Sequence, residues 1–264
     1  MKKNIVLLLT ACVNPDGMSF TQLQSPKIRK KQYCDALNFY LDNTSYPIVF
    51  VENSGCDFSC NFAEHISSNR LEYLTFEGNN YDKSIGKGLG ESKILRYALD
   101  NSLFIRNCKY FIKITGRLIV KNISHYATSK WLSFNNVFRC DLLKSGYAQS
   151  MVFVSSPKDM VELLNKNFDK INDSAGIYFE HCLYESLRNC KRTIIIPFAE
   201  APYIEGYTGS NNDKYITIPK SENLFRNLRI CTHLYAESHR YLMTALCLSV
   251  YIPYKFWFNY NKRK

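Results

Sequence analysis

A stretch of polar residues that could bind phosphate follows an apolar strand near the middle of this 264-residue chain. Residues 109–118, KYFIKITGRL, alternate apolar side chains and then lead directly into Thr115-Gly116-Arg117. Open α/β sheets bind ligands at the carboxyl ends of their strands, and the fork of an arginine can donate two parallel hydrogen bonds to a phosphate. Taken alone, the motif favours the alternative interpretation, an exposed strand end with a solvated arginine.

A second polar motif comes directly after the apolar run PIVFV. It begins with Glu52 and Asn53 and continues through a serine and a glycine. A carboxylate after the second strand of a nucleotide-binding unit commonly accepts hydrogen bonds from a ribose or a base. A plain turn is the alternative interpretation, because the same residue types favour turns.

A third motif, GKGLGE, covers residues 86–91 and precedes a predicted helix. It is not a phosphate-binding P-loop, because the ending GK[ST] and its spacing are absent. Glycines such as Gly88 at a helix start let backbone N–H groups approach a ligand, and Lys87 could add positive charge. Glu91 could instead be a carboxylate favoured by the N-terminal end of the helix dipole.

Two further motifs complete the set of five. Glu180 lies among apolar residues in the segment DSAGIYFEH, where a carboxylate is a general-base candidate. A structural bond to Tyr184 or Arg188, at helical spacing, is the alternative. The loop 204–215, IEGYTGSNNDKY, offers hydroxyls, glycines and charged groups that suit either a phosphate or sugar clamp or a surface turn.

The elements that must position these motifs alternate between strands and helices. Strands are predicted over 4–12, 47–51, 71–76, 109–114, 151–155 and 192–197, and helices over 26–43, 91–101, 157–167 and about 175–188. Apolar runs of strand length between amphipathic helices indicate an α/β fold, of Rossmann type, with a mainly parallel sheet. The opening MKKNIVLLLTAC has too short an apolar run for a signal peptide, so we interpret it as the first strand.

Composition limits the classes of partner. The formal net charge of +11 favours nucleic acid, anionic lipid or a phosphorylated substrate. Nucleic acid is not expected, because no zinc finger, RNP-like strand or helix-turn-helix pattern is found. Ten cysteines without a CxxC pair or a secretory signal indicate reduced thiols in the cytoplasm and no zinc site.

The end of the chain is aromatic and basic. Residues 241–258 approach the length of a membrane span, but Pro253 and Lys255 interrupt the apolar run. A helix lying in the membrane interface and a helix packed on the core fit equally well. We therefore divide the chain into residues 1–220, a catalytic domain, and 221–264, a helical extension that associates with a membrane or packs on the domain.

The five motifs, in this order, resemble those of bacterial glycosyltransferases that build O-antigen and capsular polysaccharide. The resemblance extends from about Asn4 to Tyr215 and includes FVENSG, GKGLGE, ITGR, YFEH and IEGYTGS. It implies a GT-A-like α/β domain, Glu180 as the catalytic residue facing the acceptor, and a nucleotide-diphosphate sugar as donor. The donor-binding residues that it implies are Thr10, Glu52, Asn53, Lys87, Gly88, Glu91, Thr115, Gly116, Arg117, Glu205, Thr208 and Gly209.

The resemblance departs from the GT-A pattern at the metal site. Such enzymes usually carry an Asp-x-Asp that holds Mg or Mn on the donor diphosphate, but the corresponding strand ends in Thr115-Gly116-Arg117. Either a metal is bound elsewhere or cationic side chains replace it, and we favour the second alternative. No metal ligand is assigned.

The function predicted from the sequence is sugar transfer to a hydroxyl of an oligosaccharide that is lipid-linked, in surface polysaccharide or lipopolysaccharide biosynthesis. The enzyme, a hexosyltransferase, would lie in the cytoplasm, peripheral to the inner face of the inner membrane, held at its anionic surface by residues 221–264. Two alternatives stay open: a polysaccharide transferase with a different phosphorylated donor, and a non-catalytic assembly protein at the membrane surface.

Overall fold

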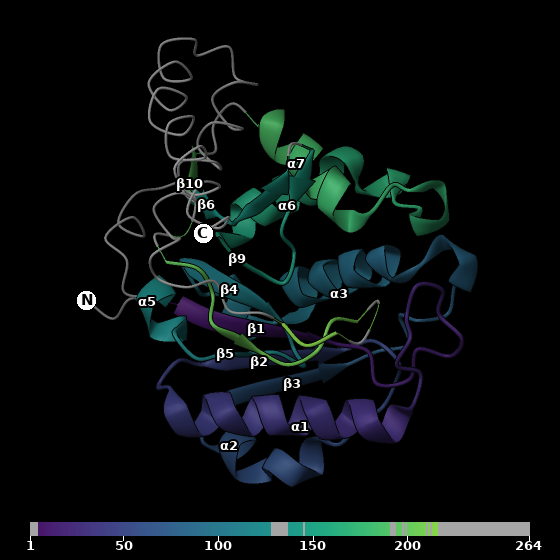
Figure 1. Ribbon diagram of the computed structural model, residues 1–264. Helices are drawn as coiled ribbons and strands as arrows, with labels where there is room; N and C mark the ends of the chain where they lie inside the picture. Colours follow the sequence, from purple (N-terminus) through teal and green to yellow (C-terminus); the bar gives the residue numbers. More distant parts are fainter. Residues whose placement is uncertain are drawn as a thin grey trace, which may run out of the picture.

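The computed structural model is built on a seven-stranded sheet with the order β10-β6-β9-β4-β1-β2-β3 (Figure 1). The strands are β1 (Ile5–Ala11), β2 (Ile48–Glu52), β3 (Leu71–Thr75), β4 (Tyr110–Thr115), β6 (Val137–Arg139), β9 (Val152–Ser155) and β10 (Ile194–Ile196). Within this sheet β9 runs antiparallel to both of its neighbours, and the other pairs are parallel. The predicted α/β fold with a mainly parallel sheet is therefore confirmed.

The structure describes residues 5–127, 137–144, 146–190 and 194–215 apart from 197, 199, 210 and 212. The predicted extension 221–264 lies outside these residues. Among the described helices, none combines the length and the apolar character that crossing a bilayer requires.

Side chains of the central strands alternate between two apolar cores. In β1, Leu7 and Leu9 pack into the core shared with α1 (Pro26–Asn43), whereas Val6 and Leu8 pack into the core on the opposite face. This two-residue period follows from the pleat of a strand. Because both faces are covered, the strands read as nearly continuous apolar runs.

Helices cover both faces of the sheet (Figure 1). On the face opposite α1 lie α3 (Lys87–Asn101), α6 (Pro157–Asn167) and α7 (Phe179–Arg188), whose buried residues belong to the second core. The short helices are α2 (Ala63–Ser67), α4 (Leu103–Arg106) and α5 (Ile123–Ala127), and 3-10 turns cover Ser59–Phe62, Lys83–Ile85, Phe168–Lys170 and Asp173–Ala175.

Two small two-stranded sheets bring distant segments to the carboxyl end of β4. Strand β5 (Ile119–Val120) pairs with β11 (Ile204–Glu205), which returns the loop 204–215 to this edge. Strands β7 (Leu142–Lys144) and β8 (Tyr147–Ala148) form a hairpin just before β9. Strands β6, β7 and β8 are not among the predicted strands, because runs of two or three residues give too little periodic signal.

The starts of two helices differ from the prediction. Helix α3 begins at Lys87 and not at residue 91, so the glycine-rich motif forms its first turn. Helix α7 begins at Phe179 and not near residue 175, because Gly176 adopts a left-handed conformation with φ of 75°. The chain of a right-handed helix cannot continue through that conformation.

Candidate functional site

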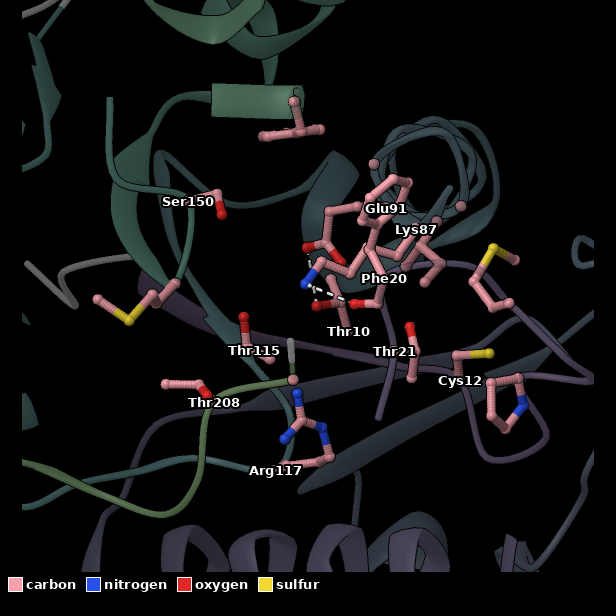
Figure 2. A pocket seen from close by; sticks show the side chains of 18 of the residues that line it. Thr10, Cys12, Phe20, Thr21, Lys87, Glu91, Thr115, Arg117, Ser150 and Thr208 are labelled. Carbon is pink, nitrogen blue, oxygen red and sulfur yellow. Dashed lines mark hydrogen bonds between the residues drawn. The ribbon is translucent and has the colours of Figure 1, made fainter. Parts of the chain in front are cut away.

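A pocket of about 1000 Å³ opens at the carboxyl ends of β1 and β4 (Figure 2). Its walls come from the loop after β1, the start of α3, the start of α7 and the loop 204–215. The predicted site residues that line it are Thr10, Asn53, Lys87, Gly88, Glu91, Thr115, Arg117, Glu180, Thr208 and Gly209. Predicted site residues up to 199 positions apart in the sequence, from Thr10 to Gly209, therefore line one cavity.

Two cations flank the loop 204–215 inside this pocket. The Nη1 of Arg117 donates to the backbone oxygen of Tyr207 at 3.0 Å, and the Nζ of Lys87 donates to that of Phe20 at 3.4 Å. A Cβ added to Gly209 would lie 2.8 Å from Arg117 Nη2 and 4.0 Å from Lys87 Nζ. Both positive charges therefore lie close to Gly209, in one part of the pocket.

The surrounding protein lowers the pKa of the Lys87 side chain. The side chain is exposed to the pocket, yet protein atoms surround it on most sides. This burial lowers the pKa of Lys87 from its usual 10.5, and the negative charges of Glu180 and Asp173 partly oppose the shift.

The carboxylate of Glu180 faces the same pocket from the first turn of α7. Its Oε1 accepts a hydrogen bond from Ser150 Oγ at 2.5 Å, and the hydroxyl of Tyr147 is a second partner. Burial, followed by the charge of Glu180, raises the pKa of Tyr147. These partners differ from Tyr184 and Arg188, the structural alternative drawn from helical spacing.

Lys113, to which the sequence analysis assigns no role in the site, lies beneath the pocket at the centre of β4. It is 0% exposed, and its Nζ is 2.5 Å from Glu91 Oε1. Thr10 Oγ1 donates to the same Glu91 oxygen at 2.9 Å. The alternative in which Glu91 serves the helix dipole is wrong, because α3 begins four residues earlier and the carboxylate reaches the sheet. The position of a lysine inside an otherwise apolar strand is the sequence feature that could have indicated a buried ion pair here.

Glu52 does not contact the pocket, so its predicted role as a direct nucleoside ligand does not fit its position. The residue is 0% exposed. Its carboxylate accepts hydrogen bonds from the backbone N–H groups of Val13, Ser54 and Cys56, and from the hydroxyls of Ser54 and Thr75. With its oxygens occupied in this way, Glu52 fixes the two loops that follow β1 and β2.

Gly116 and Glu205 also lie outside the pocket lining. The N–H of Gly116 donates to the backbone oxygen of Thr10 at 2.9 Å, and a Cβ added to Gly116 would lie 2.7 Å from that backbone oxygen. Gly116 therefore serves the close approach of the chain after β4 to the end of β1. Glu205 forms a surface ion pair with Lys121 at 2.9 Å, so neither residue fits the predicted direct contact with a donor.

The N-terminus of α3 is occupied by a carboxylate of the protein itself. The N–H of Gly88 donates to Asp173 Oδ2 at 3.2 Å, and Gly86, with φ of 96°, leaves room for the Asp173 side chain. Asp173 is 3% exposed, and burial raises its pKa from 3.8 against the opposing hydrogen bond of Gly88. The predicted approach of a ligand to these N–H groups is wrong, because Asp173 takes that place.

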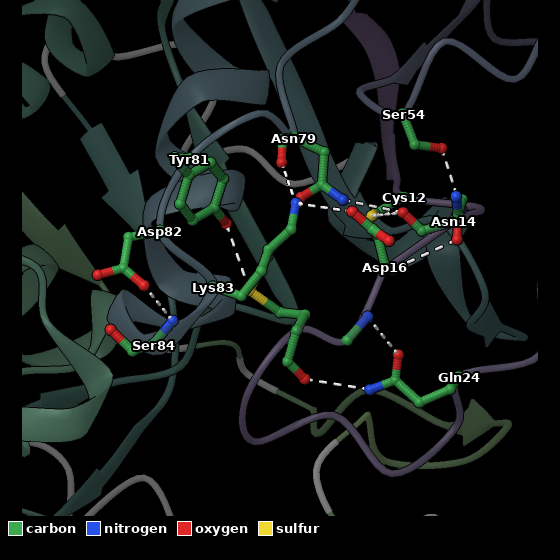
Figure 3. A network of polar contacts seen from close by, with 12 residues as sticks. Cys12, Asn14, Asp16, Gln24, Ser54, Asn79, Tyr81, Asp82, Lys83 and Ser84 are labelled. Carbon is green, nitrogen blue, oxygen red and sulfur yellow. Dashed lines mark hydrogen bonds and ion pairs between the residues drawn. The ribbon is translucent and has the colours of Figure 1, made fainter.

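A polar network fixes the loop that joins β1 to α1 (Figure 3). Asn79 Nδ2 donates to the Asn14 oxygen at 2.9 Å, and Gln24 Nε2 donates to the Met18 oxygen at 3.1 Å. Lys83 contacts Asp16 at 3.7 Å. Residues of this loop line one wall of the pocket together with Asn53 and Asn79, so the network fixes that wall.

The edge of the sheet where the GT-A pattern places a divalent metal lacks the ligands for one. Among the described residues, no group of three His, Cys, Asp or Glu side chains gathers closely enough to hold one. The edge where the GT-A pattern expects two carboxylates offers Thr115 and Arg117, with the ammonium of Lys113 below them. Hydroxyl and cationic groups are not the oxygen-rich anionic ligands that Mg or Mn prefers.

Comparisons with known proteins give similarity in shape at low sequence identity. No protein-family model matches the sequence, and no curated protein matches it either. A cytidylyltransferase from Leptospira borgpetersenii shares 12% identity and a TM-score of 0.41, with 86% of each chain covered. Residues 1–349 of TarS from S. aureus, in complex with UDP, share 13% identity and a TM-score of 0.42, over 92% of this chain and 70% of that fragment. Core-mannan synthase A from Aspergillus fumigatus, in a Mn/GDP form, shares 8% identity and a TM-score of 0.45, over 89% of this chain and 84% of the synthase chain.

Proposed function

We propose that this chain is a glycosyltransferase that moves a sugar from a nucleotide-diphosphate sugar to a hydroxyl of an oligosaccharide. The observation that carries the proposal is the arrangement of Lys87 and Arg117 around one part of a pocket that Glu180 also lines. Two cations suit a diphosphate leaving group, and a carboxylate across the cavity suits a base that activates an acceptor hydroxyl.

The reaction follows from these positions. The acceptor hydroxyl gives its proton to Glu180, whose carboxylate Ser150 orients. A bond forms between the acceptor oxygen and the anomeric carbon, and the bond from that carbon to the diphosphate oxygen breaks. Lys87 and Arg117 stabilise the negative charge that develops on the departing diphosphate. Every group invoked lines the same cavity.

We further propose that the acceptor is lipid-linked and that the pathway builds a bacterial surface polysaccharide. The support is the resemblance of the five sequence motifs, together with the basic, aromatic residues 221–264. Such a segment suits the anionic cytoplasmic face of a membrane, where it would hold the catalytic residues 1–220 near a lipid-bound acceptor.

Arg117→Ala tests the proposal directly. Thermal unfolding would be followed with UDP, GDP, CDP and ADP, and with UDP-glucose, UDP-N-acetylglucosamine and GDP-mannose. A ligand at about 100 times its Kd stabilises the folded state by about 2.7 kcal/mol. We expect one nucleotide series to stabilise the natural protein, and the variant to lose that shift and sugar transfer while keeping its own melting temperature.

Lys121→Ala is the matched control, because Lys121 carries the same charge but pairs with Glu205 outside the pocket. It should bind the same nucleotides as the natural protein. Absence of a shift with every nucleotide, or full transfer by Arg117→Ala, would contradict the proposed activity. A shift with nucleotides but transfer from no nucleotide sugar would favour a different phosphorylated donor.

A further inference from the structure

The buried ammonium of Lys113 has all of its donors committed to the protein. Its Nζ is 2.5 Å from Glu91 Oε1, 2.7 Å from the backbone oxygen of Ser150 and 3.2 Å from Thr115 Oγ1. An ammonium has three N–H donors, so these contacts saturate it. Lys113 is therefore unable to bind a ligand itself, and its charge acts through Glu91.

The two oxygens of Glu91 have different surroundings. Oε1 receives both Lys113 and the hydroxyl of Thr10. Oε2 accepts no hydrogen bond from the residues that the structure describes, and the side chain is 21% exposed where it lines the pocket. Oε1 is therefore held by residues at the base of the pocket, and Oε2 can accept a hydrogen bond from a ligand in the pocket.

The position of Glu91 explains why its charge must be neutralised. Lys87 and Glu91 are four residues apart on α3, so they lie on the same face of the helix, one turn from each other. An uncompensated carboxylate this close to the proposed diphosphate site would repel the donor. Paired with Lys113, Glu91 remains a strong acceptor without adding net negative charge.

We propose that Glu91 binds a sugar hydroxyl of the donor through Oε2 and that Lys113 is the positioning residue that makes this binding compatible with the adjacent diphosphate. The inference rests on the proposed transfer from a nucleotide-diphosphate sugar. A hydroxyl is the matching group because it donates to a carboxylate and carries no charge, whereas the cations Lys87 and Arg117 disfavour a cationic ligand at this site. The hydroxyl belongs either to the ribose or to the transferred sugar.

Two variants separate the charge of the pair from its hydrogen bond. Lys113→Met leaves the Glu91 carboxylate without its partner, whereas the double variant Lys113→Met with Glu91→Leu replaces the whole pair by apolar groups of similar size. Replacing both members of a buried ion pair generally preserves folding better than removing one. Melting temperature and circular dichroism of each variant, without ligand, report on folding.

Ligand affinities would be measured by calorimetry with the nucleotide sugar that stabilises the natural protein most in the panel above. The same nucleoside, its monophosphate, its diphosphate and the 2′-deoxy and 3′-deoxy diphosphates complete the series. In Lys113→Met we expect affinity to fall more with each added phosphate, by about tenfold or more for the diphosphate, because repulsion from Glu91 grows with ligand charge. A purely structural role would weaken all of these ligands by a similar factor.

In the double variant the charge of Glu91 is absent, so we expect the extra loss of affinity with each added phosphate to disappear. We also expect the protein to lose its preference for ligands that carry the hydroxyl bound by Glu91. If Glu91 binds the ribose, the preference for a ribose over a deoxyribose diphosphate, about tenfold in the natural protein, should vanish. If it binds the transferred sugar, the difference in affinity between nucleotide sugar and diphosphate should vanish instead. Unchanged discrimination in both comparisons would overturn the inference while leaving the proposed transfer intact. Failure of the natural protein to bind any nucleotide would contradict the transfer itself and the inference with it.

Discussion

At the scale of single residues, the proposed diphosphate site makes the charge of Lys87 a testable feature of the pocket. Burial lowers its pKa from 10.5, so the side chain loses its proton at a lower pH than a free lysine. Binding that needs the cation is complete below the lowered pKa and weakens as the pH rises through it. Lys87→Arg keeps a positive charge over this whole range, because guanidinium does not titrate there.

We therefore expect nucleoside diphosphate affinity to fall in the alkaline range for the natural protein and to stay constant for Lys87→Arg. Calorimetric titration between pH 7 and pH 10 with the best-binding nucleoside diphosphate of the panel measures the difference. Lys121→Arg is the control, because Lys121 lies outside the pocket, and it should follow the natural protein. Parallel profiles for Lys87→Arg and the natural protein would show that Lys87 does not contact the diphosphate.

At the scale of elements, the start of α3 depends on a glycine that accommodates Asp173. Gly86 has φ of 96°, and an added Cβ would overlap the Asp173 side chain. Gly86→Ala should therefore destabilise the protein by about 2–4 kcal/mol through combined strain and overlap. Gly176→Ala is the reference variant, because its φ of 75° is also positive and nothing lies within 4 Å of an added Cβ. The two positions differ in ψ, which is 12° at Gly176 and 177° at Gly86, so the reference reports the cost of an ordinary left-handed alanine without overlap.

The reference variant should lose only about 1–2 kcal/mol, the cost of a left-handed conformation for alanine. Urea unfolding of both variants measures the two free energies of unfolding. Equal losses would mean that Asp173 moves away without cost and does not hold the helix start. We also expect Gly86→Ala to weaken nucleotide binding more than Gly176→Ala, since Lys87 directly follows Gly86.

Helices whose ends are marked by residues within or next to the helix were predicted correctly from the sequence. Helix α1 and helix α6 begin and end as predicted, because a serine N-cap followed by proline marks each start. The start of α3 was missed, because three glycines in five residues count against a helix. Asp173, which lies 85 positions from Gly88, supplies the stabilising contact, and nothing near residue 88 reveals it.

At the scale of the whole molecule, the sequence order of the motifs predicted which loops meet, but not what each side chain contacts. Arg117, Lys87 and Glu180 line one pocket because they follow elements whose ends share one edge of the sheet. The partners of Glu52 and Glu91 come from other strands, so burial and long-range pairing decide their roles. Such contacts depend on strand order and register, which a single sequence does not specify.

We propose that the segment 221–264 recruits the whole molecule to a membrane, and its basic end allows a specific test. Replacing Lys262, Arg263 and Lys264 by glutamine should weaken binding to anionic vesicles by about 3 kcal/mol, at about 1 kcal/mol for each basic residue near the surface. Removing all residues after Asn223 should abolish the binding, because the aromatic side chains are then lost as well. Sedimentation with phosphatidylglycerol vesicles measures both effects, and neutral phosphatidylcholine vesicles show how much of the binding depends on charge. If the segment packs on the core instead, the natural protein should stay in the supernatant and the truncated protein should unfold at a lower temperature.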